Sequence, residues 1–268
     1  SVNEIIISDK ININFKIEET EKFFVERINI FGNNVTRESV IRNQIEIDEG
    51  DPFNQILYSK SLNNIKALNF FEKVEGEILD GNEFNTKIIN ITIEEKATGE
   101  IFAGVGTGTD GSSFAFGVKE NNYLGKGIRL STNLTIAEEE IKGKFAVVNP
   151  NFNNTDRSLN ATVESSTSDF LSTGGFKTSR TGFSMGTGFE QYQDLYVNFD
   201  VSTYYEKLET ASTASSHKKR QEGDYFENLL NYKLTLNKLD QNFQPTEGHK
   251  ISFNQVLPIY SDDLSIEN

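Results

Sequence analysis

The segment Leu195–Tyr205, which reads LYVNFDVSTYY, alternates apolar and polar side chains along its whole length. Successive side chains of a β-strand point to opposite sides, so Val197, Phe199 and Val201 would share one face. Asn198 and Asp200 would share the other face. A run of this length matches the roughly 9–11 residues that a tilted strand needs to cross a lipid bilayer. The segment therefore predicts a membrane-crossing β-strand.

Similar segments follow one another from about residue 100 to the end of the chain, and none has the period of a helix. Alternation of apolar and polar residues over such stretches is typical of barrel strands. We expect about nine antiparallel strands, near residues 100–108, 112–121, 127–137, 139–148, 157–168, 177–190, 194–206, 224–237 and 248–259.

The period of two also predicts which side chains face lipid. A shift of one residue would turn Asn198, Asp200 and Lys233 toward hydrocarbon, at about 2–4 kcal/mol for a lysine at the bilayer centre. We therefore expect lipid to face Ile101, Val105, Ile128, Leu130, Leu134, Val197, Phe199, Val201, Leu234 and Leu236.

A soluble β-sandwich would also show alternating strands, and three features favour a barrel over it. The segments are longer than the usual five or six residues of globular strands. The connection Glu206–Gly223 is long and polar, whereas Gln191–Asp194 is short. Aromatic residues gather near strand ends, as the girdles at membrane interfaces do; they are Phe189, Tyr192, Tyr204, Tyr205, Tyr225 and Phe226.

Glycine usage divides the chain into two parts. Of the 20 glycines, only Gly32, Gly50, Gly76 and Gly81 precede residue 99. We therefore place a domain boundary at Lys96–Gly99, and expect domains at residues 23–97 and 98–268. Residues 1–22, with strand-like Ile5–Ile7 and Ile11–Ile17, would be the end of a preceding domain.

The first domain reads as β-α-α-β-β. The predicted strands are Phe24–Phe31, Phe71–Leu79 and Thr86–Glu95. Thr36 suits a helix N-cap, ahead of a helical face with Val40, Ile41 and Ile45. A second helix at about Asn54–Leu68 would turn four apolar side chains inward, namely Leu57, Leu62, Ile65 and Leu68. The order predicts an α+β domain with one covered sheet face.

Composition excludes several classes of function. The net charge is −14, from 40 acidic and 26 basic residues, which argues against nucleic-acid binding. The absence of cysteine excludes disulfide scaffolds and thiolate chemistry. No apolar run reaches about 18 residues, so no transmembrane helix is predicted. The chain begins at Ser1, so we expect either a removed leader or a start inside a longer protein.

No group of residues suggests an enzyme. His217 and His249 lack metal-ligand spacing, and Glu138–Glu140 reads as a solvated loop tip. The spacing Gly104-x-Gly106-x-Gly108 resembles a phosphate loop, but a strand rather than a helix follows it. The basic run His217–Arg220 could touch lipopolysaccharide phosphates, but a simple soluble loop is the preferred interpretation. We expect no catalytic residues, no metal and no cofactor.

The ordered combination of several segments resembles a known family. VERINIFGNNVTRESVIRNQIEIDEGDPFN (Val25–Asn54) with LNFFEKVE (Leu68–Glu75) resembles the POTRA domain next to the barrel in BamA-type outer-membrane assembly factors. GEIFAGVGTGTDGSSFAFGVKENNYLGKG (Gly99–Gly127) resembles the first hairpin of their surface-antigen barrels. Asn149–Phe152 and Pro245–Gly248 lie where such proteins carry similar turns. The resemblance covers essentially the whole chain.

The resemblance implies a sixteen-stranded transmembrane β-barrel, of which this chain would carry about nine strands after one POTRA domain. We therefore expect a middle piece of a longer protein, which forms a curved open sheet or a strained small barrel rather than a closed sixteen-stranded barrel. If the first barrel strand rises from the periplasm, the Glu206–Gly223 loop is extracellular, and the Asn149-Pro150 and Pro245–Gly248 turns are periplasmic. The expected location is the bacterial outer membrane.

The resemblance also implies a function without bond chemistry, namely folding nascent outer-membrane proteins into the bilayer. Clients would pair with the first barrel strand, through Ile101, Phe102, Ala103, Gly104, Val105, Gly106, Thr107 and Gly108. The glycines weaken strand packing there, although a tight barrel wall could also explain them. A second pairing edge would be the POTRA strand around Phe71, Glu72, Lys73, Val74 and Glu75.

The partners implied are nascent outer-membrane proteins, accessory assembly lipoproteins, periplasmic chaperones and outer-membrane lipid, with no nucleic acid. Two alternatives remain open at this point. One is a secretion or autotransporter-assembly barrel of the same superfamily. The other is a passive porin or adhesin barrel, which would lack the POTRA unit.

Overall fold

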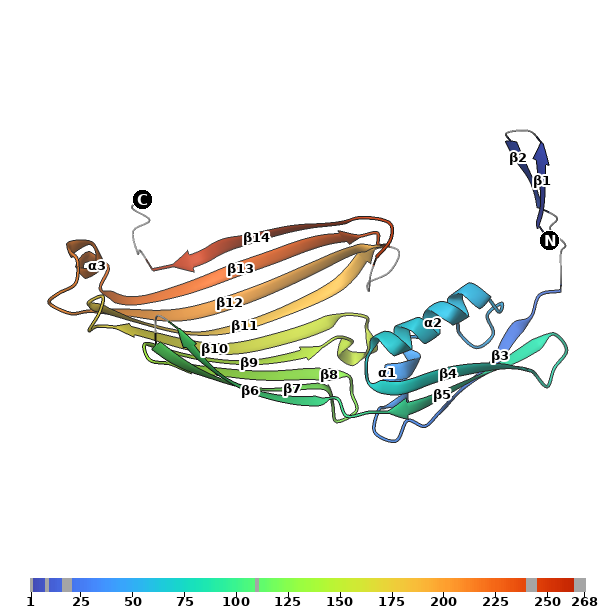
Figure 1. The fold of residues 1–268 in the computed structure, drawn as a ribbon, viewed down its shortest axis with the longest axis horizontal. Helices are drawn as coiled ribbons and strands as arrows, with labels where there is room; N and C mark the ends of the chain where they lie inside the picture. Colours follow the sequence, from blue (N-terminus) through green and yellow to red (C-terminus); the bar gives the residue numbers. More distant parts are fainter. Residues whose placement is uncertain (1, 8–9, 16–20, 109–110, 240–244, 263–268) are drawn as a thin grey trace. The chain divides into compact units, whose positions relative to one another are not determined.

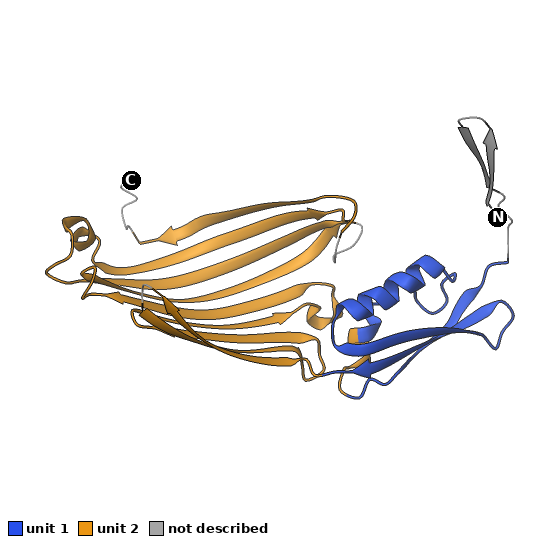
Figure 2. Cartoon of the chain, in the orientation of Figure 1, with its two compact units in different colours: residues 1–34, 41–96 blue, residues 35–40, 97–268 orange. Residues whose placement is uncertain are grey.

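A computed structural model describes residues 2–7, 10–15, 21–108, 111–239 and 245–262. The chain forms two compact units, which Figure 2 shows in different colours. Unit 1 comprises residues 1–34 and 41–96, and unit 2 comprises residues 35–40 and 97–268. Within the described ranges, no helix is long and apolar enough to span a membrane.

A small hairpin precedes the main body of unit 1. Strands β1 (Val2–Ile7) and β2 (Lys10–Phe15) pair antiparallel, with Val2 opposite Phe15. This confirms the predicted strand pair as far as Phe15. Ile17 lies outside the described residues.

The main body of unit 1 is a three-stranded sheet with helices on one face (Figure 1). Strand β5 (Thr86–Glu95) lies between β3 (Phe24–Phe31), which runs parallel to it, and β4 (Phe71–Asp80), which runs antiparallel. Helices α1 (Glu38–Arg42) and α2 (Gln55–Ala67) complete the predicted β-α-α-β-β order. The core is largely β-branched; its buried residues are Val25, Ile28, Ile41, Ile47, Tyr58, Ile65, Phe70, Phe71, Val74, Ile89, Ile91 and Ile93.

The helices differ from the prediction in detail. Helix α1 begins at Glu38, so Thr36 does not immediately precede it, and Ile47 rather than Ile45 is buried. Helix α2 has Asn54 as its N-cap, whose side chain accepts hydrogen bonds from the backbone N–H groups of Ile56 and Leu57.

Helix α2 also buries a different stripe from the one predicted. Ile65 is buried as expected, but Tyr58 and Ser61 are buried beside it, while Leu57, Leu62 and Leu68 are only half-buried. Gly76 on β4 explains the difference, because a Cβ there would lie 2.1 Å from the Tyr58 hydroxyl oxygen. Because Gly76 has no side chain, the Tyr58 ring can pack directly against the sheet.

Unit 2 is a nine-stranded antiparallel sheet in which neighbours in sequence are neighbours in space (Figure 1). The number of strands and their positions agree with the prediction to within a few residues. The strands are β6 (Gly99–Gly108), β7 (Gly111–Tyr123), β8 (Ile128–Ala137), β9 (Glu140–Asn149), β10 (Ser158–Phe170), β11 (Phe176–Tyr192), β12 (Leu195–Thr210), β13 (Gly223–Asn237) and β14 (Lys250–Ser261).

The register gives the sheet one apolar and one polar face. One continuous row of cross-strand partners is mostly apolar: Ile101, Val118, Thr132, Phe145, Val163, Phe183 and Thr203. The adjacent row is mostly polar: Phe102, Gly117, Asn133, Lys144, Glu164, Gly182, Tyr204 and Glu227. All ten side chains predicted to face lipid fall on the apolar face. Asn198 and Asp200 fall on the polar face.

Two of the predicted girdle aromatics lie on the wrong face. Tyr204 pairs with Gly182 on the polar face, where the Arg180 guanidinium lies 4.0 Å from its ring centroid. Tyr225 pairs with Glu206 and donates its hydroxyl to the Gln221 carbonyl. Tyr205 and Phe226 are also near strand ends but lie on the apolar face. Nearness to a strand end therefore does not predict which face an aromatic side chain occupies.

The polar face is held by cross-strand ion pairs. The Arg180 guanidinium lies 3.8 Å from the Glu206 carboxylate and 3.4 Å from that of Glu227. Lys144 pairs with Glu164 on the neighbouring strand at 3.5 Å. Such pairs fix register, because a slip of one residue would break them all.

The connections correct two expectations. The second part of the chain does contain helical turns, namely α3 (Ser216–Arg220) in the long β12–β13 loop and a 3-10 turn at Phe152–Asn154. Loop length also separates the two ends of the sheet poorly. Residues 138–139 make a tight connection at the end that bears α3, whereas residues 150–157 make a longer one at the opposite end.

Helix α3 has a local explanation. The Ser215 side chain accepts a hydrogen bond from the Lys218 backbone N–H and caps the helix. The side chain of Lys219 donates to the Ser212 carbonyl at 2.6 Å. One capped turn is too short for a periodic apolar pattern, which is why the sequence did not reveal it.

The nine-stranded sheet is open, which is one of the two expected forms. Strands β6 and β14 are the two ends of the strand order and do not pair with each other in the described part of the chain. Strands β7 to β13 each have a partner on both sides.

The packing of α2 predicts a large difference between two isoleucines of one helix. Ile65 is 0% exposed and Ile56 is 77% exposed. Ile65→Ala should lower the free energy of unfolding of unit 1 by about 2–5 kcal/mol, because it leaves a cavity. Ile56→Ala should change it by less than about 0.5 kcal/mol. Urea denaturation, monitored by hydrogen exchange at the β5 amides, measures the free energy of unfolding of both variants. Equal effects of the two substitutions would contradict the packing.

Unit 1 also predicts a specific pH dependence. Hydrogen bonds from the Thr86 hydroxyl and from Asn82 lower the pKa of Glu26 from 4.5 to about 2. Because the folded pKa is lowered, this stabilisation is present above pH 4.5 and is lost as the pH falls toward 2. The amide chemical shift of Asn82 should titrate with a midpoint near 2. In Glu26→Gln this titration should vanish, and a midpoint near 4.5 in the unaltered chain would contradict the assignment.

Candidate functional site: two open sheet edges

The predicted client-pairing residues Ile101–Gly108 form most of strand β6, the terminal strand of the nine-stranded sheet. Every residue of β6 is exposed, and its partner is β7 alone in the described part of the chain. Ile101, Ala103, Val105 and Thr107 lie on the apolar face. The other backbone edge of β6 therefore presents N–H and C=O groups that β7 does not use.

The glycines of β6 lie on one face of the strand. Gly104, Gly106 and Gly108 lie on the polar face, and among the described residues a Cβ at Gly104 or Gly108 would have no atom within 4 Å. A Cβ at Gly106 would lie 3.0 Å from the Ser113 hydroxyl oxygen. Glycine also loosens the backbone of a strand that no side chain packs.

The base of β6 is firmly held, in contrast to its middle. The Thr98 hydroxyl donates to the Glu120 carboxylate, which also accepts from the Asn122 backbone N–H at 2.7 Å. The Asn121 side chain donates to the Thr98 carbonyl at 3.1 Å. These contacts fix the strand where it enters the sheet.

Asn122 extends this network within unit 2. Its side chain is buried, donates to the Thr36 hydroxyl at 2.8 Å and accepts from the Gly127 backbone N–H at 2.8 Å. The Arg37 backbone N–H donates to the Gly125 carbonyl at 2.8 Å. Residue 125 must be glycine here, because its φ is +67° and a Cβ would lie 1.9 Å from the Val35 carbonyl oxygen.

Unit 1 has two sheet edges, and one of them is closed by side chains. On the outer side of β3, the Ile28 backbone N–H donates to Glu49 at 3.0 Å and the Ile28 carbonyl accepts from Arg42 at 2.9 Å. The backbone of residues 50–51 bonds both polar groups of Val25. Side chains and loop backbone thus take the place of a neighbouring strand along β3.

The other edge is β4, which contains the predicted residues Phe71, Glu72, Lys73, Val74 and Glu75. Phe71 and Val74 are buried, and the side chains between and after them are exposed. Among the described residues, β4 has only β5 as a strand partner. The Lys73 ammonium pairs with Glu75 at 2.8 Å, and this hydrogen bond raises the lysine pKa. β4 is therefore the open edge of unit 1.

The sequence identified both edge strands but missed what closes β3 and what holds the base of β6. Arg42 is the last residue of α1 and Glu49 follows the helix in sequence, and no periodic pattern indicates that they reach back to Ile28. Asn122 lies in a polar run that resembles any other turn. Side-chain bonds across 86 residues, such as Thr36–Asn122, have no local signal.

The structure adds no chemistry to the other polar groups. His217 lies in α3 and His249 follows a turn, and the described residues contain no cluster of three or more metal-ligating side chains. The Glu139 carboxylate accepts a hydrogen bond from the Thr173 hydroxyl at 2.7 Å, which ties two loops together. These groups are explained by local structure.

Comparison with known families covers both units. The profile described as the Omp85 superfamily domain matches residues 122–265, and the POTRA profile, described as surface antigen variable number repeat, matches residues 23–96. The outer membrane protein assembly factor BamA of Neorickettsia risticii is 26% identical over 248 residues, which cover 91% of this chain and 33% of that protein. A putative outer membrane protein assembly factor of Treponema pallidum is 33% identical over 144 residues, covering 51% of this chain and 17% of that protein.

Solved structures show the same fold. The crystal structure of BamA from Haemophilus ducreyi lacking POTRA domains 1–3 superimposes with a TM-score of 0.71 at 21% identity, covering 97% of this chain and 53% of that one. CdiB from Acinetobacter baumannii gives a TM-score of 0.53 at 9% identity, covering 89% of this chain and 47% of that one. The chain spans about a third of the length of the Neorickettsia relative.

The Asn122 network predicts a local loss of stability at the base of β6. Asn122→Ala leaves the Gly127 N–H without an acceptor and the Thr36 hydroxyl without this donor, at about 1–3 kcal/mol. Asn133→Ala, which removes an exposed asparagine from β8, should cost less than about 0.5 kcal/mol. Hydrogen exchange at residues 98–101 and 120–128 measures the effect, and equal protection in the two variants would argue against the anchor.

Proposed function

Because the chain belongs to the Omp85 superfamily of outer-membrane proteins, we propose that it is part of an assembly factor that inserts nascent β-barrel proteins into the bacterial outer membrane. The chain lies in the outer membrane, with its POTRA unit in the periplasm. The observation that carries the proposal is the identity of strand β6, which directly follows the POTRA unit and contains Gly104, Gly106 and Gly108. In the described part of the chain its strand partner is β7.

A client strand is stabilised strongly by pairing with such an edge, because the edge lies in the bilayer. In hydrocarbon an unpaired backbone group costs several kcal/mol, so a strand entering the bilayer is stable only when paired. The free edge of β6 would supply that pairing one strand at a time. Main-chain hydrogen bonds are common to all sequences, so the same edge would serve many clients.

The two ends of β6 suit different tasks. Thr98, Glu120 and Asn122 hold its periplasmic base, which would keep the template in position. Gly104, Gly106 and Gly108 leave its upper part without side-chain packing on the polar face. A strand fixed at one end and loose at the other can separate from a neighbour and accept a new one without leaving the sheet.

The open β4 edge of the POTRA unit would act earlier, by binding extended client segments or partner proteins in the periplasm. Because side chains close β3, β4 offers the accessible strand edge of the three-stranded sheet. Accessory assembly lipoproteins and periplasmic chaperones are the partners proposed for this unit. The energy would come from client folding, with no cofactor and no bond chemistry.

Relatives named as assembly factors favour insertion over a passive porin or adhesin, and the POTRA unit does the same. A secretion barrel of the same superfamily remains the second candidate. It would use the lumen as a path for its substrate and would not need client strands to pair with β6.

Disulfide trapping tests the β6 proposal directly, because the chain has no native cysteine. Single cysteines at Ala103, Val105 and Thr107, in the longest form of the protein that contains this chain, should give adducts with cysteines in the terminal strand of a client. The adducts should depend on register, since pairing fixes which residues are opposite each other.

Cysteines at Val197 and Phe199 are the matched controls, because they lie on the same apolar face in β12, between β11 and β13. They should give few adducts. Equal trapping from β12 would show that β6 has no special role, and adducts without register preference would show contact without strand pairing.

A further inference from the structure

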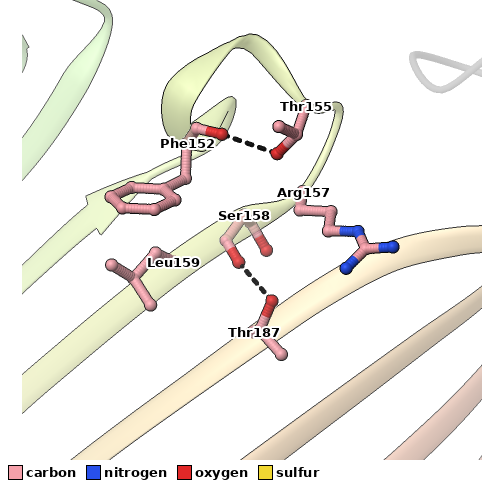
Figure 3. A pocket seen from close by; sticks show the side chains of 6 residues that line it. All are labelled: Phe152, Thr155, Arg157, Ser158, Leu159 and Thr187. Carbon is pink, nitrogen blue, oxygen red and sulfur yellow. Dashed lines mark hydrogen bonds between the residues drawn. The ribbon is translucent and has the colours of Figure 1, made fainter.

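A cavity of about 370 Å³ lies at the connection between β9 and β10 (Figure 3). Its lining combines the apolar side chains of Phe152 and Leu159 with the cationic side chain of Arg157, and is completed by Thr155, Ser158 and Thr187. We propose that this cavity binds the phosphate headgroup of a membrane phospholipid, with Arg157 as the anion-binding residue. The proposal rests on the location of the sheet in the outer membrane, and not on the insertion function.

The cavity opens on the face of the sheet that meets lipid. Leu159 pairs with Thr187, and Thr187 pairs with Phe199, so all three lie in one cross-strand row of the apolar face. Phe189, two residues from Thr187 on β11, pairs with Val197 on the same face. A ligand here would therefore approach from the bilayer.

The level of the cavity in the membrane follows from topology. β10 begins at the same end of the antiparallel sheet as β6, and β6 directly follows the periplasmic POTRA unit. The β9–β10 connection thus lies at the periplasmic interface, where the leaflet is built of phospholipids. Phe152 and Tyr192 are exposed at this end, as aromatic residues at an interface are.

Arg157 is oriented and electrostatically available. Its guanidinium carbon lies 5.4 Å from the Phe189 ring centroid, and no carboxylate pairs with it in the described part of the chain. This cation–π contact places the guanidinium beside the ring. Its N–H groups make no side-chain hydrogen bond within the described residues, so they can donate to a ligand. In a chain of net charge −14, a cation without a counter-ion at a lipid interface matches an anionic group.

The other polar groups around the cavity are satisfied by the turn itself. The Thr155 hydroxyl donates to the Phe152 carbonyl at 2.6 Å, and the Thr187 hydroxyl donates to the Ser158 carbonyl at 2.8 Å (Figure 3). The Phe152 backbone N–H donates to the Arg157 carbonyl at 2.7 Å. The turn is thus internally bonded, and Arg157 is the donor left for a ligand.

The apolar wall distinguishes a lipid from a free anion. Inorganic phosphate would use Arg157 alone, whereas a phospholipid would also place its glycerol and upper acyl carbons against Leu159 and Phe152. Packing of those carbons against the wall adds van der Waals contacts that inorganic phosphate lacks. The occupant is therefore assigned as a phospholipid.

Native mass spectrometry tests the proposal on the longest form of the protein that contains this chain, solubilised in detergent, with phosphatidylglycerol as the probe. The unaltered chain should retain one phosphatidylglycerol, and Arg157→Gln should weaken retention about tenfold, because a charge-assisted hydrogen bond is lost. Diacylglycerol with the same acyl chains lacks the phosphate. The unaltered chain should therefore retain it only weakly, at about the level at which Arg157→Gln retains phosphatidylglycerol. Arg157→Lys, which keeps the charge, should retain more lipid than Arg157→Gln.

Arg129→Gln is the matched control. Arg129 lies near the same end of the sheet, in β8, but on the polar face opposite to its neighbour Leu130. This variant should bind lipid like the unaltered chain. Circular dichroism before and after heating should show that all variants keep the sheet. Phe152→Ala, at the apolar wall, gives a second measurement of the same site and should also weaken retention.

Three results would overturn the proposal. Equal retention by Arg157→Gln and the unaltered chain would show that Arg157 binds no phosphate. An equal loss in Arg129→Gln would show a general effect of charge. Displacement of the lipid by millimolar inorganic phosphate, with Phe152→Ala behaving like the unaltered chain, would show an anion site without lipid specificity.

Discussion

The backbone hydrogen bond in a medium without water is the constraint on which the rest of the structure depends. A strand in hydrocarbon must pair on both sides, because each unsatisfied N–H or C=O group costs several kcal/mol. Strands β7 to β13 meet this condition within the chain, while β6 and β14 each have one partner. The strands must therefore keep one register. Their length, the alternation of apolar and polar side chains and the cross-strand ion pairs of the polar face all favour that register. The function proposed for β6 follows from the same constraint, because a client strand that enters the bilayer also needs a partner for its backbone hydrogen bonds.

The chain distinguishes between edges that are closed and edges that are open. In unit 1, Arg42 and Glu49 bond both backbone groups of Ile28, so β3 presents few unused hydrogen bonds. β4 has no equivalent cover among the described residues, and its exposed charged side chains keep it soluble. In unit 2, the base of β6 is fixed through Glu120 and Asn122, while its glycines leave the upper part without side-chain packing. Open edges are an aggregation risk in most proteins, and two of those in this chain, β4 and β6, are the positions proposed to bind other chains.

The sequence predicted those features that depend on a period of two or on local turn chemistry. The nine barrel strands, the three POTRA strands and the ten residues of the apolar face follow from alternation alone. Features that depend on contacts between distant segments were not predictable. Tyr58 is buried because Gly76 leaves space for it, and Thr36 bonds Asn122 rather than immediately preceding a helix. Tyr204 and Tyr225 lie on the polar face because adjacent residues of a strand alternate, so their position near a strand end was misleading. Of the candidate site, the two edge strands could be proposed from sequence, but the closure of β3 and the anchor of β6 could not.

Hydrogen–deuterium exchange in detergent micelles tests the central claim most directly, on the longest form of the protein that contains this chain, with and without a synthetic peptide that carries the terminal strand of a client. If β6 is the template, the amides of residues 99–108 should become protected when the peptide is added, and those of β12 should not change, because β12 already has two partners. A scrambled peptide with the same composition but no alternation should protect β6 much less. Protection confined to β14, or no change along β6 at peptide concentrations that saturate binding, would contradict the account.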